Sequence, residues 1–287
     1  MFIPIEIRYN IYIIFWHAFH RGKQQRSLST HHFSIFSIII NAERISSGFV
    51  STFAFIVGLG ASLGLWRVVQ HVPRWQAARW LNAGLLTLFC ILAGARLDYV
   101  LFHGAYFAQN PLEAIEIWMG GLAWPGALIG GLAALMIVAV SWHVPLGLIA
   151  DTLSPLAAPL AIAVWLGCWQ AGCAYGPLIP ANAWWGIPCR DESGAFAQRL
   201  PLQALAALTL VVFFSWLEAK TFPRGTNGRL ASLAGLGLSL NLLIFSILRV
   251  DPAPLWQGIR PDIWIAVGLT IVSLTACAYI FWPKEKS

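Results

Sequence analysis

Charged residues are scarce in this sequence. Asp, Glu, Lys and Arg make up 10% of its 287 residues, whereas roughly a quarter of the residues of a soluble domain are charged. Hydrophobic residues account for 58% of the chain. This composition excludes an ordinary soluble domain and indicates a protein that lies in a membrane.

Apolar stretches of about 20 residues, the length needed to cross a bilayer as a helix, recur along the chain. Short segments of alternating polarity, which are typical of a transmembrane β-barrel, are absent from the sequence. We therefore predict an all-α, polytopic membrane protein with about seven transmembrane helices. The predicted helices lie near residues 48–66, 81–102, 121–141, 146–170, 200–217, 229–248 and 262–282.

Cysteine is also infrequent, and the five cysteines are too few and too dispersed for a disulfide scaffold. Cys90 and Cys277 lie within apolar stretches, where a small buried side chain is the ordinary interpretation. Cys168, Cys173 and Cys189 lie near one predicted loop, without a histidine at metal-ligand spacing. We expect no metal site and no cofactor.

The net charge of +6 comes from basic residues scattered over short connections rather than gathered in a stripe, which argues against nucleic-acid binding. Basic residues in cytoplasmic connections orient membrane proteins. Eight of them fall on one side of a seven-helix path, so we predict a cytoplasmic C-terminus. They are Arg67, Arg74, Arg79, Lys220, Arg224, Arg229, Lys284 and Lys286, and the opposite connections carry Arg190, Arg199, Arg249 and Arg260.

The first 45 residues do not fit this topology, because their basic residues would lie on the outer side. Arg8, Arg21, Lys23, Arg26 and Arg44 belong to this segment. Two interpretations remain open: an additional anchor around residues 10–20, or upstream sequence that the working protein lacks. We favour the second and divide the chain into an extension, residues 1–45, and a transmembrane domain, residues 46–287.

Polar side chains within or beside apolar stretches are energetically costly and point to function. Arginine is well suited to phosphate because its planar fork is always charged, but arginines near a membrane boundary also extend to the headgroups as anchors. We expect anchoring for Arg199 and Arg260, and leave both interpretations open for Arg96 and Arg249. The other polar residues in such positions are Asp98, Asp151, Gln203 and Asp251.

Several segments, in this order, resemble the prolipoprotein diacylglyceryl transferase family. The resemblance covers about residues 45–285 and implies a helical fold around a lipid-accessible cavity. The matching segments are GARLDYVLF (94–102), PLEAIEIWMGGLAWPGALIGG (111–131), LIADTLSPLAAPLAI (148–162), AGCAYG (171–176), AWWGIPC (183–189), RLPLQAL (199–205) and RVDPAP (249–254).

Members of that family move the diacylglyceryl group of phosphatidylglycerol onto the cysteine thiol of a lipoprotein signal peptide and release glycerol phosphate. The resemblance thus implies a bacterial plasma membrane protein of lipoprotein biosynthesis. Its partners would be phosphatidylglycerol or another anionic phospholipid and prolipoprotein signal peptides. Such chemistry needs a group that deprotonates the thiol and positive charge that holds the departing phosphate.

The resemblance also shows substitutions at the family's functional positions. The family's histidine falls on Pro125, which carries no group for proton transfer, and the signature arginine falls on Trp165. Cys168 and Cys173 stand at the family's signature asparagine and glutamate. We therefore assign no catalytic residue from the sequence.

Arginines are retained at two positions that the resemblance associates with lipid phosphate, Arg96 and Arg249. Three functions remain open: a diacylglyceryl transferase, a catalytically silent protein of the same fold that binds lipid or signal peptide, and a transferase of altered chemistry. In the third, Cys168 and Cys173 form a covalent or redox-active pair. The residues expected to line the cavity are Gly126, Tyr175, Gly176, Arg199 and Gln203.

Overall fold

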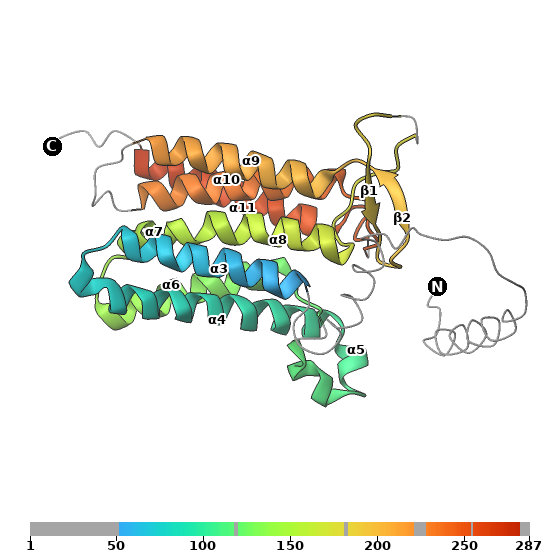
Figure 1. Ribbon diagram of the computed structural model, residues 1–287. Helices are drawn as coiled ribbons and strands as arrows, with labels where there is room; N and C mark the ends of the chain where they lie inside the picture. The colour runs from blue at the N-terminus through green and yellow to red at the C-terminus, as the bar shows by residue number, and fades with distance from the viewer. Residues whose placement is uncertain (1–51, 118–119, 181–182, 221–227, 254, 282–287) are drawn as a thin grey trace, which may run out of the picture. The chain divides into compact units, whose positions relative to one another are not determined.

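The computed structural model describes residues 52–117, 120–180, 183–220, 228–253 and 255–281. The proposed extension, residues 1–45, lies outside this range. Within it the chain runs back and forth as long helices lying side by side (Figure 1), and seven of the described segments are long and apolar enough to cross a membrane. The chain is a multi-pass membrane protein, as the sequence predicts.

The long helices agree closely with the predicted apolar stretches. They are α3 (Thr52–Gln70), α4 (Ala77–Phe102), α6 (Trp124–Trp142), α7 (Leu146–Leu153) with α8 (Ala157–Ala171), α9 (Leu202–Ala219), α10 (Arg229–Leu248) and α11 (Pro261–Phe281). Helix α3 ends four residues beyond the predicted end at 66, because polar residues such as Arg67 and Gln70 extend a helix where it reaches the membrane boundary.

The fourth predicted stretch, residues 146–170, is not one regular helix. A 3₁₀ turn, Ser154–Leu156, separates α7 from α8, and Pro155 lies at its start. Proline lacks the backbone N–H that an uninterrupted α-helix needs, so the regular hydrogen-bond ladder stops there. The two helices together still form a membrane-spanning segment, Leu146–Ala171.

The connections at one end of the bundle contain four of the smaller elements. These are α5 (Gly104–Phe107), a 3₁₀ helix (Pro111–Ile115) and a hairpin of β1 (Ile187–Arg190) and β2 (Phe196–Arg199). We call this end, with the connections 103–123, 172–201 and 249–260, the hairpin face (Figure 1).

Two clusters of buried side chains hold the bundle together. One lies between α8, α9 and α10 and contains Trp165, Leu210 and Phe245. The other joins α3, α4, α6 and α7 and contains Trp80 and Ile149. The helices that carry the hairpin face therefore pack through large apolar side chains.

Two acidic residues singled out from the sequence cap the N-termini of helices far away in the chain. Asp98 of α4 accepts a hydrogen bond of 2.9 Å from the Gly126 backbone N–H at the start of α6. Asp151 of α7 accepts bonds of 2.8 Å from Gly228 and Ala231 at the start of α10. Each carboxylate thus satisfies free N–H groups and lies at the positive end of a helix dipole.

Glycines allow α4 and α6 to approach backbone to backbone. A Cβ atom on Gly130 would lie 2.0 Å from the Cys90 carbonyl oxygen, and one on Gly126 would lie 2.2 Å from the Gly94 carbonyl oxygen. The four-residue spacing of Gly126 and Gly130 places both on the same face of α6. The helices therefore have no room for a side chain at these points.

We predict that Gly130→Val lowers the free energy of unfolding by about 1–3 kcal/mol or more, because the α4 backbone must shift. Gly268→Val on α11 is the matched control, since a Cβ there meets nothing within 4 Å. Thermal unfolding of the detergent-solubilised protein measures both. Equal melting temperatures for the two variants would contradict the close contact.

Candidate functional site

The candidate site is built around the segment that follows α8 on the hairpin face. The helix ends because Gly172 adopts a left-handed conformation with φ of 72°. A Cβ atom on this glycine would lie 2.4 Å from the Asp191 carbonyl oxygen, next to β1. Gly172 thus provides both the turn and the close approach of the hairpin.

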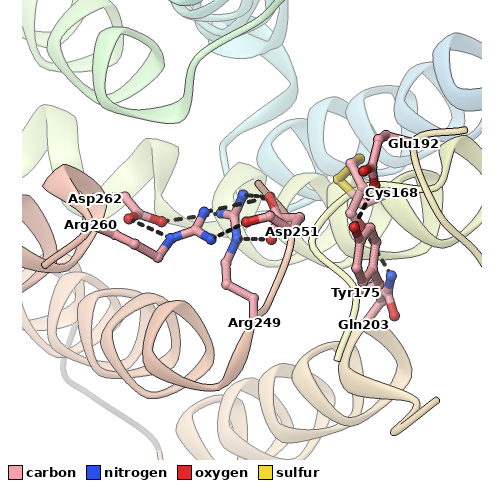
Figure 2. A network of polar contacts seen from close by, with 9 residues as sticks. Cys168, Tyr175, Glu192, Gln203, Arg249, Asp251, Arg260 and Asp262 are labelled. Carbon is pink, nitrogen blue, oxygen red and sulfur yellow. Dashed lines mark hydrogen bonds and ion pairs between the residues drawn. A yellow bond between two sulfur atoms is a disulfide. The ribbon is translucent and has the colours of Figure 1, made fainter. Parts of the chain in front are cut away.

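Cys168 and Cys173 form a disulfide across this turn (Figure 2). The Cys173 backbone N–H also donates to the Cys168 carbonyl oxygen, at 3.0 Å. The covalent cysteine pair named in the third open function is therefore present, while the altered chemistry itself stays a hypothesis. The other cysteines of the described residues, Cys90, Cys189 and Cys277, are free thiols.

The Tyr175 side chain contacts charged residues of the hairpin. Its hydroxyl donates to the Glu192 carboxylate (Figure 2), and the Arg199 guanidinium lies 4.2 Å from the centre of its ring. Burial, followed by the hydrogen bond to Glu192, raises the pKa of Tyr175 to about 12. Arg199 also forms an ion pair of 3.4 Å with Asp191. Two residues that we expected to line a cavity, Tyr175 and Arg199, are thus in contact.

Gln203 ties the same segment to the start of α9. Its side chain is fully buried and its Nε2 donates to the Cys173 carbonyl oxygen, at 2.8 Å (Figure 2). Within the described part of the chain, Gln203 Oε1 and Arg199 Nε are buried without a hydrogen-bond partner. Buried polar atoms normally have partners, so this acceptor and this donor are available to a water or a ligand hydroxyl.

Gly176 is another residue expected to line the cavity. The close approach of the Leu200 backbone explains why a glycine is needed there. A Cβ atom at this position would lie 2.7 Å from the Leu200 carbonyl oxygen and 2.9 Å from the Leu200 Cβ atom. The Leu200 N–H donates to the Pro177 carbonyl oxygen at 3.0 Å, which holds the two segments together. Gly126, by contrast, lies at the α4–α6 contact described above.

Arg249 belongs to a quartet of two arginines and two aspartates between α10 and α11 (Figure 2). Its Nε donates to Asp251 Oδ1 at 2.6 Å, its Nη2 to Asp251 Oδ2, and its Nη1 to Asp262 at 3.3 Å. Arg260 completes the quartet through Asp262, at 3.1 Å, and the Asp251 carbonyl oxygen, at 2.6 Å. We call these four residues the Arg–Asp quartet.

Contacts within the quartet shift the pKa values of Asp251 and Arg249. Burial alone would raise the pKa of Asp251, but the hydrogen bond from Arg249 and the charges of Arg249 and Arg260 outweigh it, so the pKa is lowered. Burial would likewise lower the pKa of Arg249, but hydrogen bonding to Asp251 and the charges of Asp251 and Asp262 raise it. Arg249 and Asp251 are therefore both ionised at neutral pH.

A backbone contact connects the quartet to the disulfide turn. The Val250 N–H donates to the Tyr175 carbonyl oxygen at 3.0 Å. Because Val250 lies between Arg249 and Asp251, the position of segment 173–176 is coupled to the position of the quartet. Two groups of residues that are separated in the sequence thus form one continuous arrangement on the hairpin face.

Arg96 is the other arginine predicted to bind lipid phosphate, and its hydrogen bonds are to the protein backbone. The buried guanidinium donates to four backbone carbonyl oxygens in the connection between α4 and α6. The acceptors are Glu113 at 2.6 Å, Ala114 at 2.9 Å, Gly120 at 2.5 Å and Gly121 at 3.1 Å. Arg96 therefore holds this connection in place, and phosphate binding by it stays a prediction.

Pro125 and Trp165, which the resemblance places at the family's histidine and signature arginine, have structural roles here. Pro125 is the second residue of α6, where a missing N–H costs nothing. Trp165 is buried between α8, α9 and α10, and its Nε1 donates to Asn241 Oδ1 at 3.0 Å. Asn241 in turn donates to Thr209 Oγ1 at 2.8 Å. Neither position presents a proton-transfer group to the hairpin face.

Arg199 and Arg260 differ from the expectation that they extend to headgroups as anchors. Their side chains are 10% and 12% exposed and pair with Asp191 and Asp262. Asp191, in the same connection as Arg199, and Asp262, at the start of α11, draw the guanidiniums inward. The expectation that both arginines extend to the headgroups, which rested only on their position at the membrane boundary, was therefore wrong.

Sequence reasoning did not single out several residues that complete the site. They are Asp191, Glu192, Asp262 and Asn241. One available signal was the pair Asp191–Glu192, because the whole chain has only 12 acidic residues. No group of three or more metal-ligating side chains occurs among the described residues, and the absence of a metal site stays a prediction.

Comparison with known proteins gives consistent matches over most of the chain. The sequence pattern of the family described as prolipoprotein diacylglyceryl transferase matches residues 38–280. The phosphatidylglycerol–prolipoprotein diacylglyceryl transferase of Synechococcus elongatus is 30% identical over 247 residues, which cover 81% of this chain and 79% of the relative.

Two further relatives carry the same name and match over shorter regions. The protein of Dechloromonas aromatica is 33% identical over 153 residues, 51% of this chain and 57% of the relative. That of Parasynechococcus marenigrum is 32% identical over 183 residues, 58% of this chain and 63% of the relative. The matched region thus spans less than two thirds of the length of these two relatives.

The lowered pKa of Asp251 predicts a pH-dependent stability. Ionised Asp251 contributes to the free energy of unfolding above the ordinary aspartate pKa of about 3.9. This contribution is lost as the pH falls through the lower pKa that Asp251 has in the folded protein. We expect Asp251→Asn to destabilise the protein by up to about 3–5 kcal/mol at pH 7, and by less as the pH falls to 3. Thermal unfolding across this range measures the difference, with Glu116→Gln as control. A difference that does not change with pH would contradict the assignment.

The four carbonyl acceptors of Arg96 predict that lysine cannot replace it, because an ammonium group lacks the planar fork. We expect Arg96→Lys to make the connection 103–123 about tenfold more sensitive to limited proteolysis. Arg74→Lys, at an exposed position on the opposite face, is the control with the same substitution. Unchanged proteolysis of Arg96→Lys would mean that positive charge at this position matters more than its geometry.

Proposed function

The chain belongs to the prolipoprotein diacylglyceryl transferase family, and from this premise we propose that it acts in lipoprotein biosynthesis. The proposed reaction moves the diacylglyceryl group of phosphatidylglycerol to the cysteine thiol of a prolipoprotein signal peptide. Glycerol phosphate leaves, the new thioether bond forms at the cysteine sulfur, and the thiol proton passes to a base.

The observation that carries this proposal is the Arg–Asp quartet on the hairpin face. Arg249 and Arg260 are 18% and 12% exposed in their side chains and lie at the ends of α10 and α11, where a lipid headgroup meets the membrane boundary. A phosphate on Arg249 replaces part of its contact with Asp262, the longer of its carboxylate bonds at 3.3 Å. Bidentate pairing with a guanidinium suits a phosphate as well as a carboxylate.

A silent lipid-binding protein of the same fold is the second candidate function, and specific observations favour it. The disulfide removes both Cys168 and Cys173 as free thiols. Pro125 and Trp165 have structural roles, so the positions of the family's histidine and signature arginine supply no acid, base or cation. Losing a positioned acid or base costs about 10²–10⁴ in rate, and losing an anion-stabilising group costs a similar factor.

We also propose that the protein lies in the bacterial plasma membrane with its hairpin face outside and its C-terminus in the cytoplasm. Disulfides persist in oxidising compartments, so the Cys168–Cys173 bond favours an extracytoplasmic location for this face. The helix ends at the opposite face carry basic residues, as cytoplasmic ends do. The described basic residues there are Arg67, Arg74, Arg79, Lys220 and Arg229.

The transferase proposal is tested by complementation of a bacterium depleted of its own diacylglyceryl transferase. We expect the full chain to restore maturation of an abundant lipoprotein, followed by its gel shift, and residues 45–287 to do the same if the extension is dispensable. Arg249→Ala should lose this activity, while Arg74→Ala, on the opposite face, should retain it. No rescue by a protein that is present in the membrane would reject the transferase and leave the lipid-binding candidate.

Lipid binding has its own test in the purified protein. We expect phosphatidylglycerol added to detergent micelles to raise the melting temperature, because a ligand that binds only the folded state stabilises it. Arg249→Ala should reduce this rise and Arg74→Ala should not. A rise that is equal in both variants would place the lipid contact elsewhere than the quartet.

A further inference from the structure

We propose that the Cys168–Cys173 disulfide is a redox-reversible switch that sets the position of segment 173–176 and, through it, that of the Arg–Asp quartet. Cys168 and Cys173 stand at the family's signature asparagine and glutamate, and the proposed transfer reaction uses neither of these two thiols. The partner of the switch is an extracytoplasmic dithiol reductant.

Segment 173–176 contacts the hairpin connection, the start of α9 and the residue next to the Arg–Asp quartet, and each contact begins within a few residues of the disulfide. The Cys173 carbonyl oxygen accepts from Gln203 of α9 at 2.8 Å. The Tyr175 carbonyl oxygen accepts from Val250, next to the quartet, at 3.0 Å. The Tyr175 side chain contacts Glu192 and Arg199 of the hairpin connection. Figure 2 shows Tyr175 with Glu192, and Gln203, beside the disulfide.

The location of the disulfide fits a switch better than a stabilising cross-link. Only five positions separate the cysteines, and a disulfide that closes so short a loop restricts the unfolded chain least. The left-handed Gly172 and the backbone bond from Cys173 to Cys168 already close the same turn. Both cysteines are half-buried rather than fully buried, and exchange requires that a thiolate reach the bond.

Reduction proceeds by thiol–disulfide exchange with balanced electrons. One thiolate of the dithiol attacks a sulfur of the pair, the S–S bond breaks, and the other cysteine leaves as a thiolate that takes up a proton. The second thiol of the reductant then displaces the first cysteine. The protein gains two hydrogens as two thiols, and the reductant becomes a disulfide.

The displacement on reduction falls on Cys173 rather than on Cys168. Two thiol sulfurs cannot remain at bonding distance, so one residue must move. Cys168 lies within α8, one turn after the buried Trp165, which is fixed by Asn241. Cys173 lies beyond the helix end, in the connection. Its movement disturbs the Gln203 bond directly and the Tyr175–Val250 bond through the two intervening residues.

Hydrogen exchange of the Val250 amide tests the switch in the purified full-length protein. We expect reduction with a dithiol to speed this exchange about tenfold and reoxidation to reverse it, because the amide loses its Tyr175 acceptor. The double variant Cys168→Ser/Cys173→Ser should exchange quickly under both conditions. Cys189→Ser removes a buried free thiol nearby and should behave as the wild type does. Mass spectrometry confirms reduction by the gain of two hydrogens.

Two outcomes would overturn the proposal. Unchanged Val250 exchange in a protein shown to be reduced would make the disulfide a local cross-link. Faster exchange throughout α8 and α9 would mean general loosening instead of a switch. If the double variant does not fold, reduction and reoxidation of the wild type still decide between these outcomes.

The same sample separates this proposal from the proposed function. Phosphatidylglycerol is added to the oxidised and the reduced protein, and the melting temperature is recorded. A rise in neither form would reject lipid binding while leaving the exchange result intact. A rise that is larger in the oxidised form is the result expected when the switch acts on the quartet.

Discussion

The structure depends on one constraint, namely that a polar group within or beside a lipid bilayer must find its partner inside the protein. This chain has few charged residues, and the arrangement of its helices follows from how they are satisfied. Asp98 and Asp151 reach the free N–H groups of α6 and α10. Arg96 gathers carbonyl oxygens, and Arg249 and Arg260 share two aspartates. Each of these contacts joins elements that apolar packing alone would leave free to slide.

Helix positions were predictable from the sequence because a bilayer imposes a minimum length of apolar chain, which one-dimensional inspection can detect. Partners were not predictable, because they depend on which residues meet in space. The acceptors of Arg96 lie 17 to 25 residues away, and Asp151 meets Gly228 across 77 residues. The 3₁₀ turn at Pro155 was not predicted, because the segment stays apolar enough overall to read as one membrane span and proline is tolerated in such spans.

The candidate site shows the same division. The resemblance assigned residues to the site, including Trp165 at a position where it leads us to expect an arginine. It could not show that the tryptophan donates a hydrogen bond to Asn241, 76 residues further on, or that Asn241 donates hydrogen bonds to residues of α9. The side chain at position 165 thus packs in the helix core, whereas the resemblance leads us to expect a charged side chain there that contacts a ligand. The arginines near α10 and α11 retain their charge and form the polar part of the hairpin face.

The cap that Asp151 places on α10 bears on how the protein is made. A ribosome delivers helices to the bilayer in chain order, so α7 arrives while the backbone groups that Asp151 will cap are still 77 residues from being synthesised. Until then, this carboxylate depends on water or on the insertion machinery. Completion of the bundle therefore couples its two halves during biogenesis, because the first half becomes fully satisfied only after the second has been inserted.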